Sequence, residues 1–436
     1  MNDTVGIQDV PADVRRELEE HANVVGEGIG LERTEAEGLT DRVAVVVLVE
    51  EKVEASELDE DDLLPETIEI DGEELPVDVQ EVGVVTAQEA VEVAPSEADP
   101  LAVHDVVPLE MDEDADVQTA VEGFGRVKKM RPAPGGVSIG HPAVTAGTLG
   151  SSPLRTRHGK TVFLTNNHVA AASGDAKVGD PVLQPGRFDG GADPADRIGT
   201  LLEFSTITFG SNGRNVSDSA LVEIAPDHVQ TDLFELQEDI RGWEGAVVGQ
   251  FYTKTGRTTG VTRGRCTARN VNIGVNFGSK GIANFVGLDM FERMSAGGDS
   301  GSVIGIERPE GFYGTSLLFA GSTQATFAIP MSTVQQVHGR LVPMTSHDLV
   351  EAEDLRIAGH IASGSLAASE TKYQWFGPWD PKYEVDFTVH PTSNGGYIRG
   401  SVDSLYRNQA GTYYLVKMEN RQNVAANYDV RYVVRR

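Results

Sequence analysis

Cysteine is almost absent from this sequence, because Cys266 is the only one among 436 residues and no disulfide can form within the chain. No stretch of 18 or more apolar residues occurs, which argues against a membrane-spanning helix. The first 20 residues lack the basic start and apolar core of a signal peptide, although a mature form that had lost its leader would look the same. These absences predict a soluble, cytoplasmic protein in which Cys266 is a packed small hydrophobe.

Basic residues are scarce in the N-terminal third. Residues 1–125 hold 37 Asp and Glu against 5 Lys and Arg, a balance of −32, whereas the rest of the chain balances to +1. An acidic surface over the whole chain would indicate adaptation to high salt, and this asymmetry favours a separate acidic module instead. Such a charge repels nucleic acid and anionic membranes, so neither is expected as a partner. A solubilising surface and a regulatory role are both open for this module.

The N-terminal third carries helix and strand patterns and then a stretch with little periodicity. The predicted elements are a helix over 10–25, a buried strand over 42–53 and a hairpin over 65–83 around Asp71-Gly72. We therefore expect a small acidic α+β module over residues 1–85. Residues 86–125 are rich in Ala, Glu, Asp and Pro, and we interpret them as an acidic linker.

The remaining two thirds of the chain has a β-type pattern. Residues 126–350 contain short strand-like runs separated by Gly, Asn, Asp and Pro, and residues 331–341 have the pattern of a closing helix. Residues 355–436 alternate Tyr and Val with polar residues, which indicates a C-terminal antiparallel β-sandwich. Trp375 and Trp379 within it are expected to be packing residues, with a binding patch as the alternative.

Ser300 lies in the stretch SAGGDSGS, where small residues leave room for a tight turn. A serine hydroxyl is a poor nucleophile unless a base removes its proton and donors hold the oxyanion that forms. The backbone N–H groups of Gly298 and Ser300 can point into one hollow and supply those donors. No Walker loop, dinucleotide fingerprint or CxxC pair occurs, so neither a cofactor nor a metal is expected.

His168 and Asp218 are the residues best placed to activate this serine. His168 ends the apolar run VFLTNNH, so a strand would hold it rigidly at a cleft, and Asp218 immediately precedes the buried run SALVEIA. Each residue alone has an ordinary structural explanation, but together they have the types and context of a Ser-His-Asp triad. Asp227 and Asp232 are nearby alternatives for the acid.

Five motifs of the sequence resemble those of the chymotrypsin/trypsin-like serine peptidases. TNNHVAA, SDSALVEI and GGDSGSVIG match the His, Asp and Ser motifs in the same chain order, KTGRTTGVTRG is similar to a strand of bacterial members, and LLFAGST to the strand that lines the substrate cleft. The resemblance covers about residues 135–345. The long preceding region, with AVVVLVEEKV and LPVDV, resembles a branch that includes a plant leaf-shape regulator.

This resemblance implies a mainly β fold, in which a trypsin-like double β-barrel core stands between the N-terminal α+β module and the C-terminal sandwich. The first barrel would carry His168 and Asp218, and the second would carry Ser300. The resemblance also places Met294 at the floor of the primary specificity pocket, and the other pocket residues that it implies are Ser295, Ala320, Gly321 and Ser322. Because none of these is charged, we expect an apolar residue before the scissile bond.

The predicted function is therefore a serine endopeptidase acting on polypeptides through an acyl-enzyme intermediate. The alternatives are a peptide-binding or assembly scaffold with little turnover, and an esterase. The charge step at residue 126 further suggests that residues 1–125 inhibit or gate the site. Activation by a freshly cut N-terminus is not expected, because the sequence places no amine to pair with Asp299. The oligomeric state is open.

Overall fold

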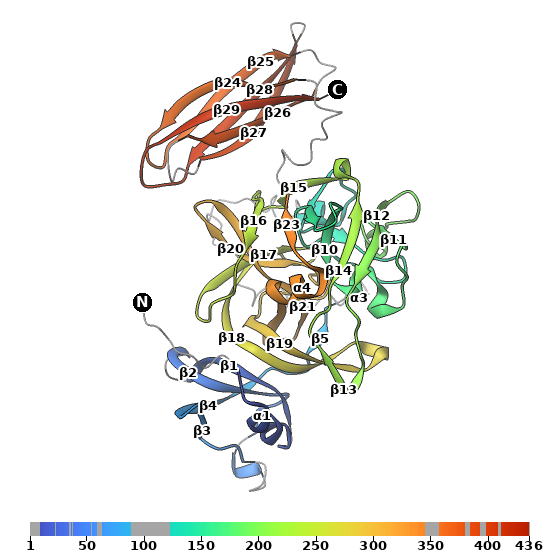
Figure 1. The fold of residues 1–436 in the computed structure, drawn as a ribbon, viewed down its shortest axis with the longest axis vertical. Coiled ribbons are helices and arrows are strands. Elements are labelled where there is room, and N and C mark those ends of the chain that lie inside the picture. The colour runs from blue at the N-terminus through green and yellow to red at the C-terminus, as the bar shows by residue number, and fades with distance from the viewer. Residues whose placement is uncertain are drawn as a thin grey trace. The chain divides into compact units, whose positions relative to one another are not determined.

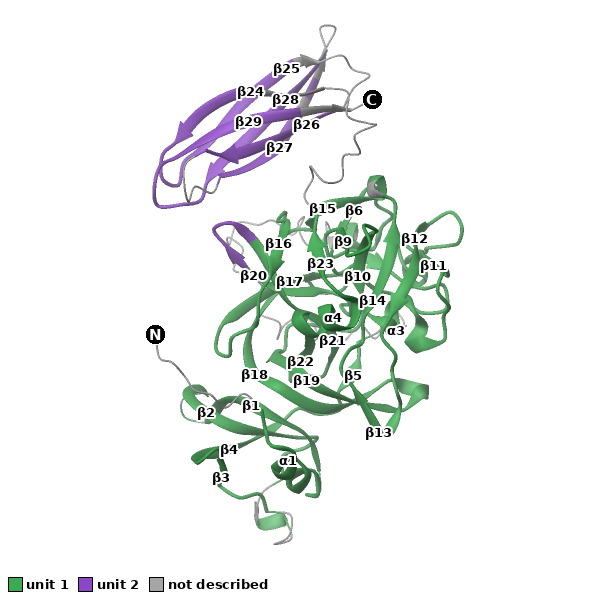
Figure 2. Cartoon of the chain, viewed as in Figure 1, with its two compact units in different colours: residues 1–306, 312–344 green, residues 307–311, 345–436 purple. Residues whose placement is uncertain are grey.

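The structure is a computed structural model that describes residues 9–21, 23–34, 36, 38–53, 55–58, 63–88, 123–344, 357–379, 384–392, 398–408 and 411–435. Most of the expected linker, residues 89–122, therefore lies outside the described residues. The chain divides into two compact units (Figure 2): residues 1–306 with 312–344, and residues 307–311 with 345–436. All three residues predicted as catalytic belong to the first unit.

An α+β module begins the first unit (Figure 1) and contains α1 (Ala12–Glu19), β1 (Val24–Thr34), β2 (Gly38–Val49), β3 (Thr67–Ile70) and β4 (Glu73–Glu81). Leu18 of α1 packs on the sheet against Ile29 and Val45. The expected hairpin is confirmed, because β3 and β4 pair antiparallel across Asp71 and Gly72, which both have positive φ. The helix expected over 10–25 ends early.

The residues that follow α1 form β1, a strand that the sequence did not predict. β1 pairs on one side with β2 and on the other with the long strand β18 (Gly260–Asn276). Gly26 and Gly30 permit this close approach, since a Cβ atom would lie 2.3 Å from Asn272 O at the first and 2.5 Å from Thr267 O at the second. These glycines weaken the strand pattern in the sequence, yet they allow the module's sheet to continue into β18.

The second barrel is a closed ring in the order β17–β18–β19–β22–β21–β20. Besides β18, its strands are β17 (Phe251–Gly256), β19 (Ile282–Glu292), β20 (Val303–Arg308), β21 (Gly311–Gly321) and β22 (Ala325–Pro330). Its interior includes Phe285, Phe319 and Phe327, which are fully buried. Helix α4 (Met331–His338) follows β22, and this confirms the expected closing helix.

The first barrel is built on a six-stranded sheet in the order β11–β12–β14–β10–β9–β23. The β7–β8 ladder extends it: Gly140 bridges to Leu183 of β11, and Gly150 N–H donates to Leu164 O of β10. The strands are β7 (Ser138–Ile139), β8 (Gly147–Thr148), β9 (Leu154–Thr156), β10 (Thr161–Thr165), β11 (Pro181–Leu183), β12 (Arg197–Phe204), β14 (Ala220–Ile224) and β23 (Leu341–Pro343). Phe163 and Val222 are buried in its core.

Shorter elements complete the first unit. The strands are β5 (Thr86–Ala87), β6 (Ala133–Gly135), β13 (Gly210–Asn215), β15 (Val229–Leu233) and β16 (Ile240–Trp243), and α3 (Asn167–Ala170) is a single helical turn. The 3-10 helices span Ala55–Glu57, Gly123–Val127, Ala172–Gly174, Arg187–Asp189, Pro226–His228 and Gly278–Lys280. None of the helices within the described ranges has both the length and the apolar character needed to cross a membrane.

The second unit contains an antiparallel β-sandwich of two three-stranded sheets, β24–β29–β26 and β25–β28–β27. Its strands are β24 (Ile357–Leu366), β25 (Thr371–Trp379), β26 (Glu384–Pro391), β27 (Ile398–Asn408), β28 (Gly411–Asn420) and β29 (Ala426–Arg435). Trp375 is 50% exposed on β25, so it is not the core residue that the sequence suggested. The expected fold class is confirmed: mainly β, with a two-barrel core, an N-terminal α+β module and a C-terminal sandwich.

Candidate active site

His168 and Asp218 meet at the ends of two paired strands of the first barrel. β10 and β14 pair with Thr165 opposite Ala220, so the residues just after β10 and just before β14 are neighbours. His168 Nδ1 lies 2.5 Å from Asp218 Oδ2, and the His168 backbone N–H donates to Asp218 Oδ1 over 3.1 Å. Both side chains are fully buried. A carboxylate on the Nδ1 side favours the tautomer in which Nε2 is the basic nitrogen.

Two asparagines directly before His168 hold the chain around Asp218. Asn166 Nδ2 donates to the Asp218 carbonyl oxygen over 2.7 Å, and Asn167 Nδ2 donates to the Ser205 carbonyl oxygen over 2.5 Å. Ser205 in turn bonds to the backbone on both sides of Asp218. The sequence offered no reason for Asn167. One indication in the sequence does suggest a structural role for both asparagines: they form a polar run at the end of a buried strand.

The loop that carries Ser300 packs against the same end of the first barrel. Thr148 N–H donates to the Ser300 carbonyl oxygen over 2.8 Å. Gly301 has a positive φ of 98°, and a Cβ atom there would lie 2.3 Å from Thr148 O and 2.4 Å from Thr165 Oγ1. Because Thr165 is three residues before His168, the Ser300 loop and the histidine lie at the same strand end.

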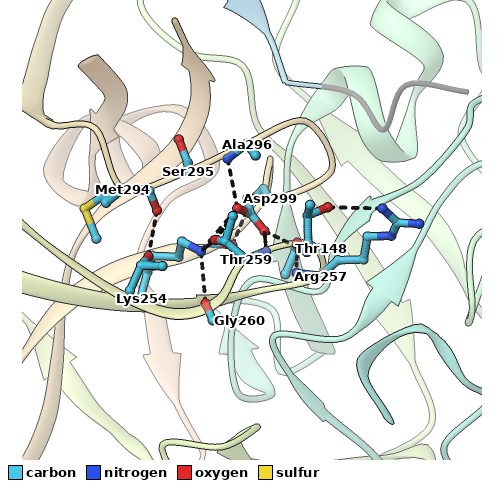
Figure 3. Close-up of polar contacts among 12 residues, drawn as sticks. Thr148, Lys254, Arg257, Thr259, Gly260, Met294, Ser295, Ala296 and Asp299 are labelled. Atoms are coloured by element: carbon cyan, nitrogen blue, oxygen red, sulfur yellow. Dashed lines mark hydrogen bonds and ion pairs between the residues drawn. The ribbon is translucent and has the colours of Figure 1, made fainter. Parts of the chain in front are cut away.

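Behind the candidate nucleophile, Asp299 forms a buried ion pair with Lys254 (Figure 3). Lys254 Nζ lies 3.2 Å from Asp299 Oδ2, and neither side chain is exposed. The carboxylate also accepts hydrogen bonds from the N–H groups of Thr258, Thr259 and Ala296 and from Thr259 Oγ1. Burial acts to raise the pKa of Asp299, but the Lys254 charge and these hydrogen bonds outweigh it and hold the pKa below its usual value.

Lys254 thus supplies the cation that the sequence-based reasoning did not find for Asp299. Lys254 lies just before the GRTTG motif. The arginine of this motif, Arg257, also makes contacts that hold the Ser300 loop. Arg257 forms a two-point pair with Asp189 of the first barrel, with Nε to Oδ2 at 2.9 Å and Nη2 to Oδ1 at 2.5 Å. Its backbone N–H donates to Thr148 Oγ1, which donates to the Gly298 carbonyl oxygen. The motif therefore links both barrels to the Ser300 loop.

The residues expected to form the specificity pocket lie in two groups. Met294 packs into a core cluster with Cys266 and Phe291, where burial also raises the pKa of the Cys266 thiol. Ser295 is buried and its Oγ lies 2.8 Å from Thr326 Oγ1. The packed environment of Cys266 agrees with its expected role as a small hydrophobe.

The second group, Ala320, Gly321 and Ser322, is at the end of β21. Gly321 lies directly opposite Thr326 in the β21–β22 pair, so Gly321 and the Ser295–Thr326 contact are adjacent. Ser322 Oγ accepts the N–H groups of the following turn and is only partly buried. Its role in binding substrate stays a prediction.

Strand β5, from the start of the expected linker, runs along this wall. Ala87 pairs antiparallel with Ala320, and Thr86 pairs with Gly321. On its other side Thr86 pairs with Asn276 of β18. The linker expectation is therefore wrong for these residues, because the two neighbouring strands satisfy their backbone groups.

Gln88, directly after β5, contacts the loop that carries Ser300. Gln88 N–H donates to the Phe319 carbonyl oxygen over 3.2 Å, and the Gln88 carbonyl oxygen accepts the Gly298 N–H over 2.8 Å. Ser300 Oγ donates to the same Phe319 carbonyl oxygen over 3.0 Å. Phe277 packs edge-on against His168 with ring centroids 6.0 Å apart. Ser300, like His168, has no exposed surface in this arrangement.

Among known proteins, the chain is similar to several solved structures. No family model and no curated protein matches the chain. Protease A of Thermobifida fusca matches with 20% identity and a TM-score of 0.36, covering 49% of this chain and 98% of that one. A chymotrypsin of Cellulomonas bogoriensis matches with 20% identity and a TM-score of 0.35, covering 49% and 99%. A glutamic acid-specific serine protease matches with 21% identity and a TM-score of 0.35, covering 48% and 100%.

Proposed function

We propose that this chain is a serine endopeptidase in which Ser300, His168 and Asp218 form the catalytic triad. The observation that carries the proposal is the buried contact of 2.5 Å between His168 Nδ1 and Asp218 Oδ2, at the strand end against which the Ser300 loop packs. A buried carboxylate on one imidazole nitrogen, with a serine on a glycine-flanked turn nearby, is suited to acyl transfer.

In the proposed mechanism, His168 Nε2 takes the Ser300 proton while Ser300 Oγ attacks a peptide carbonyl carbon. A hydroxyl has one hydrogen, so the Ser300 side chain first turns away from the Phe319 carbonyl oxygen, to which it donates in this structure. Asp218 stabilises the imidazolium, and the N–H groups of Gly298 and Ser300 bind the oxyanion. His168 then protonates the leaving amine, and water hydrolyses the acyl-enzyme.

The oxyanion donors need the Ser300 loop to hold its turn. Asp299 holds that turn because its carboxylate accepts a hydrogen bond from the Ala296 N–H and forms an ion pair with Lys254. Because Lys254 is part of the folded barrel, this arrangement requires no cleavage to create a new amine. The loop therefore holds its N–H donors in place before the substrate binds. Such preorganisation is the main source of oxyanion stabilisation in sites of this kind.

The test is labelling by a fluorophosphonate probe beside a peptide-library cleavage assay, each with wild type and Ser300→Ala. We expect the wild type to be labelled and to cut peptides, and Ser300→Ala to do neither. Absence of labelling and of cleavage both in the folded full-length protein and in a folded variant that lacks residues 1–88, and with them β5, would refute the proposal. Rates on matched ester and amide substrates separate a peptidase from an esterase.

A scaffold with little turnover is the second candidate, and the pairing of residues 86–88 with β21 favours it. Thr86, Ala87 and Gln88 lie where a bound peptide would pair with β21, and Ser300 is fully buried. A scaffold predicts that peptides bind wild type and Ser300→Ala equally and leave both uncut. A peptidase predicts product from the wild type alone.

A further inference from the structure

Residues 86–88 lie beside β21 in the manner of a bound peptide. Ala87 and Thr86 pair antiparallel with Ala320 and Gly321, and the Gln88 N–H donates to the carbonyl oxygen of Phe319. Three consecutive residues therefore pair with the last residues of β21, a strand that lies beside the candidate nucleophile loop. Main-chain pairing of this kind provides affinity, and the side-chain pocket at its end provides selectivity.

The carbonyl group of Gln88 occupies the place where a reacting carbonyl would be held. It accepts the Gly298 N–H over 2.8 Å, and this is one of the two donors assigned to the oxyanion. We propose that the Gln88–Glu89 bond is a substrate of the chain's own site, and that the primary pocket selects glutamine. The proposal rests on the proposed peptidase function and specifies its substrate.

The Gln88 side chain is buried beside Gly321, one of the uncharged residues that the sequence places in the primary pocket. Gln88 is 6% exposed, and its Nε2 lies 2.2 Å from the position that a Cβ atom would take at Gly321. Thr326, opposite Gly321, and Ser295 contribute hydroxyl groups to this region. The carboxamide therefore packs directly against Gly321, and any larger residue at position 321 would clash with it.

Charge explains why an amide is preferred to a carboxylate here. Among the residues that the structure describes, no donor lies within hydrogen-bond distance of Gln88 Oε1. A neutral amide loses one hydrogen bond in that position, whereas a glutamate would bury a full charge. The proposal thus specifies a polar, uncharged side chain, where the sequence led us to expect an apolar one.

The reaction is an ordinary hydrolysis of one peptide bond. Ser300 Oγ forms an ester bond to the Gln88 carbonyl carbon as the bond to the Glu89 nitrogen breaks, and His168 passes the serine proton to that nitrogen. Water then cleaves the ester, which leaves a carboxylate on Gln88 and restores the Ser300 hydroxyl. The pairing of β1 with β18 keeps the N-terminal fragment attached after the cut.

The first experiment measures the intact mass of purified full-length protein over time. We expect wild type to yield two fragments, one ending at Gln88 and one beginning at Glu89, at a rate per molecule that does not depend on protein concentration. Ser300→Ala should stay a single chain. Full-length protein that stays intact or is cut elsewhere, while the variant lacking residues 1–88 is labelled by fluorophosphonate, would overturn this inference and leave the proposed function standing.

Substitution at Gln88 tests the selectivity. Gln88→Glu has the same shape and should slow self-cleavage by at least about 100-fold at neutral pH, because the charge is buried without a partner. Gln250→Glu, at an exposed glutamine of the same unit, is the matched control and should cut at the wild-type rate. Equal rates for Gln88→Glu and wild type would contradict a glutamine-selective pocket.

A compensating pair of substitutions locates the pocket at Gly321. Gly321→Val places side-chain atoms where the Gln88 carboxamide lies and should abolish self-cleavage, even if the variant folds normally. Gln88→Ala alone should cut slowly, because the pocket is left empty. It also removes the clash with the valine side chain at position 321, so the double variant should regain cleavage after residue 88 at about the rate of Gln88→Ala alone. Failure of the double variant to recover, with fluorophosphonate labelling intact, would show that this side chain does not enter a pocket at Gly321.

Discussion

Two buried acid–base pairs flank Ser300, and they are built differently. His168–Asp218 belongs to the first barrel and Lys254–Asp299 to the second, and none of these side chains is exposed. Asp299 accepts five hydrogen bonds, including the one from Lys254, whereas the contacts of Asp218 with His168 are one from the ring and one from the backbone. A carboxylate with five donors is locked as an anion that shapes a loop. An imidazole next to a carboxylate can exchange a proton near neutral pH.

Breaking the His168–Asp218 pair should have the largest effect. Asp218→Asn keeps the side-chain volume, but its amide can donate to His168 Nδ1 and stabilise the wrong tautomer. We expect kcat to fall about 10⁴-fold with little loss of stability. The measurement is steady-state cleavage of a peptide, with circular dichroism as the folding control. A fall of less than tenfold would indicate that another acid, such as Asp227 or Asp232, orients His168.

Breaking the locked pair should reduce stability as well as activity. Lys254→Met leaves Asp299 as a buried charge without its cation, which we expect to cost about 3–5 kcal/mol in the free energy of unfolding. The loosened turn should also lower kcat by about 10²–10³-fold through the oxyanion donors. Denaturant unfolding and peptide cleavage measure the two effects.

A double variant serves as the control for this pair. Lys254→Met with Asp299→Asn removes both charges, so it should regain part of the lost stability without regaining activity. A single variant that loses less than about 1 kcal/mol would contradict the view that Lys254 compensates a buried charge.

The sequence predicted the His168–Asp218 pair but not the Lys254–Asp299 pair, and this difference has a physical cause. The order and local context of His168, Asp218 and Ser300 predicted which residues could cooperate, because each lies at the end or start of an apolar run. Their catalytic roles stay predictions. Lys254 carried no such signal, because a lysine in a strand looks like a solvated charge until the barrel closes around it.

Other features depend on contacts between segments far apart in the chain. β5 becomes a strand only because β18 and β21 supply partners, and Thr86 meets Gly321 across 235 positions. The glycines of β1 obscure its strand pattern until β18 is present beside them. The fold class was predictable because it depends on alternation within each strand, which is a local property.

A third buried pair, Glu27 with Arg15, shows a carboxylate that is compensated less completely. Glu27 contacts Arg15 Nε at 2.7 Å and accepts a hydrogen bond from Asn272 Nδ2 at 2.6 Å. Burial outweighs these partners and raises the pKa of Glu27 from 4.5 to about 7. Asn272 belongs to β18, so this carboxyl lies where the N-terminal module joins the barrel.

The shifted pKa of Glu27 predicts a pH dependence of stability. Between about pH 4.5 and 7 the folded form binds more protons than the unfolded form, so stability falls as pH rises through this window. The loss should reach at most about 3 kcal/mol. Glu27→Gln should remove this slope in denaturant unfolding, whereas Glu50→Gln, at an exposed residue of the same module, should retain it. An unchanged slope in Glu27→Gln would assign the titration to another group.

An exposed ion pair between Lys160, directly before β10, and Glu223 of β14 should have the smallest effect of all. Lys160 Nζ lies 2.7 Å from Glu223 Oε2, and the side chains are 44% and 42% exposed. Solvent screens such a pair, so Lys160→Met should change the free energy of unfolding by no more than about 1 kcal/mol and leave kcat/KM unchanged. This pair matches Lys254–Asp299 in chemistry and differs in burial. A loss as large as that of Lys254→Met would therefore show that burial is not what distinguishes them.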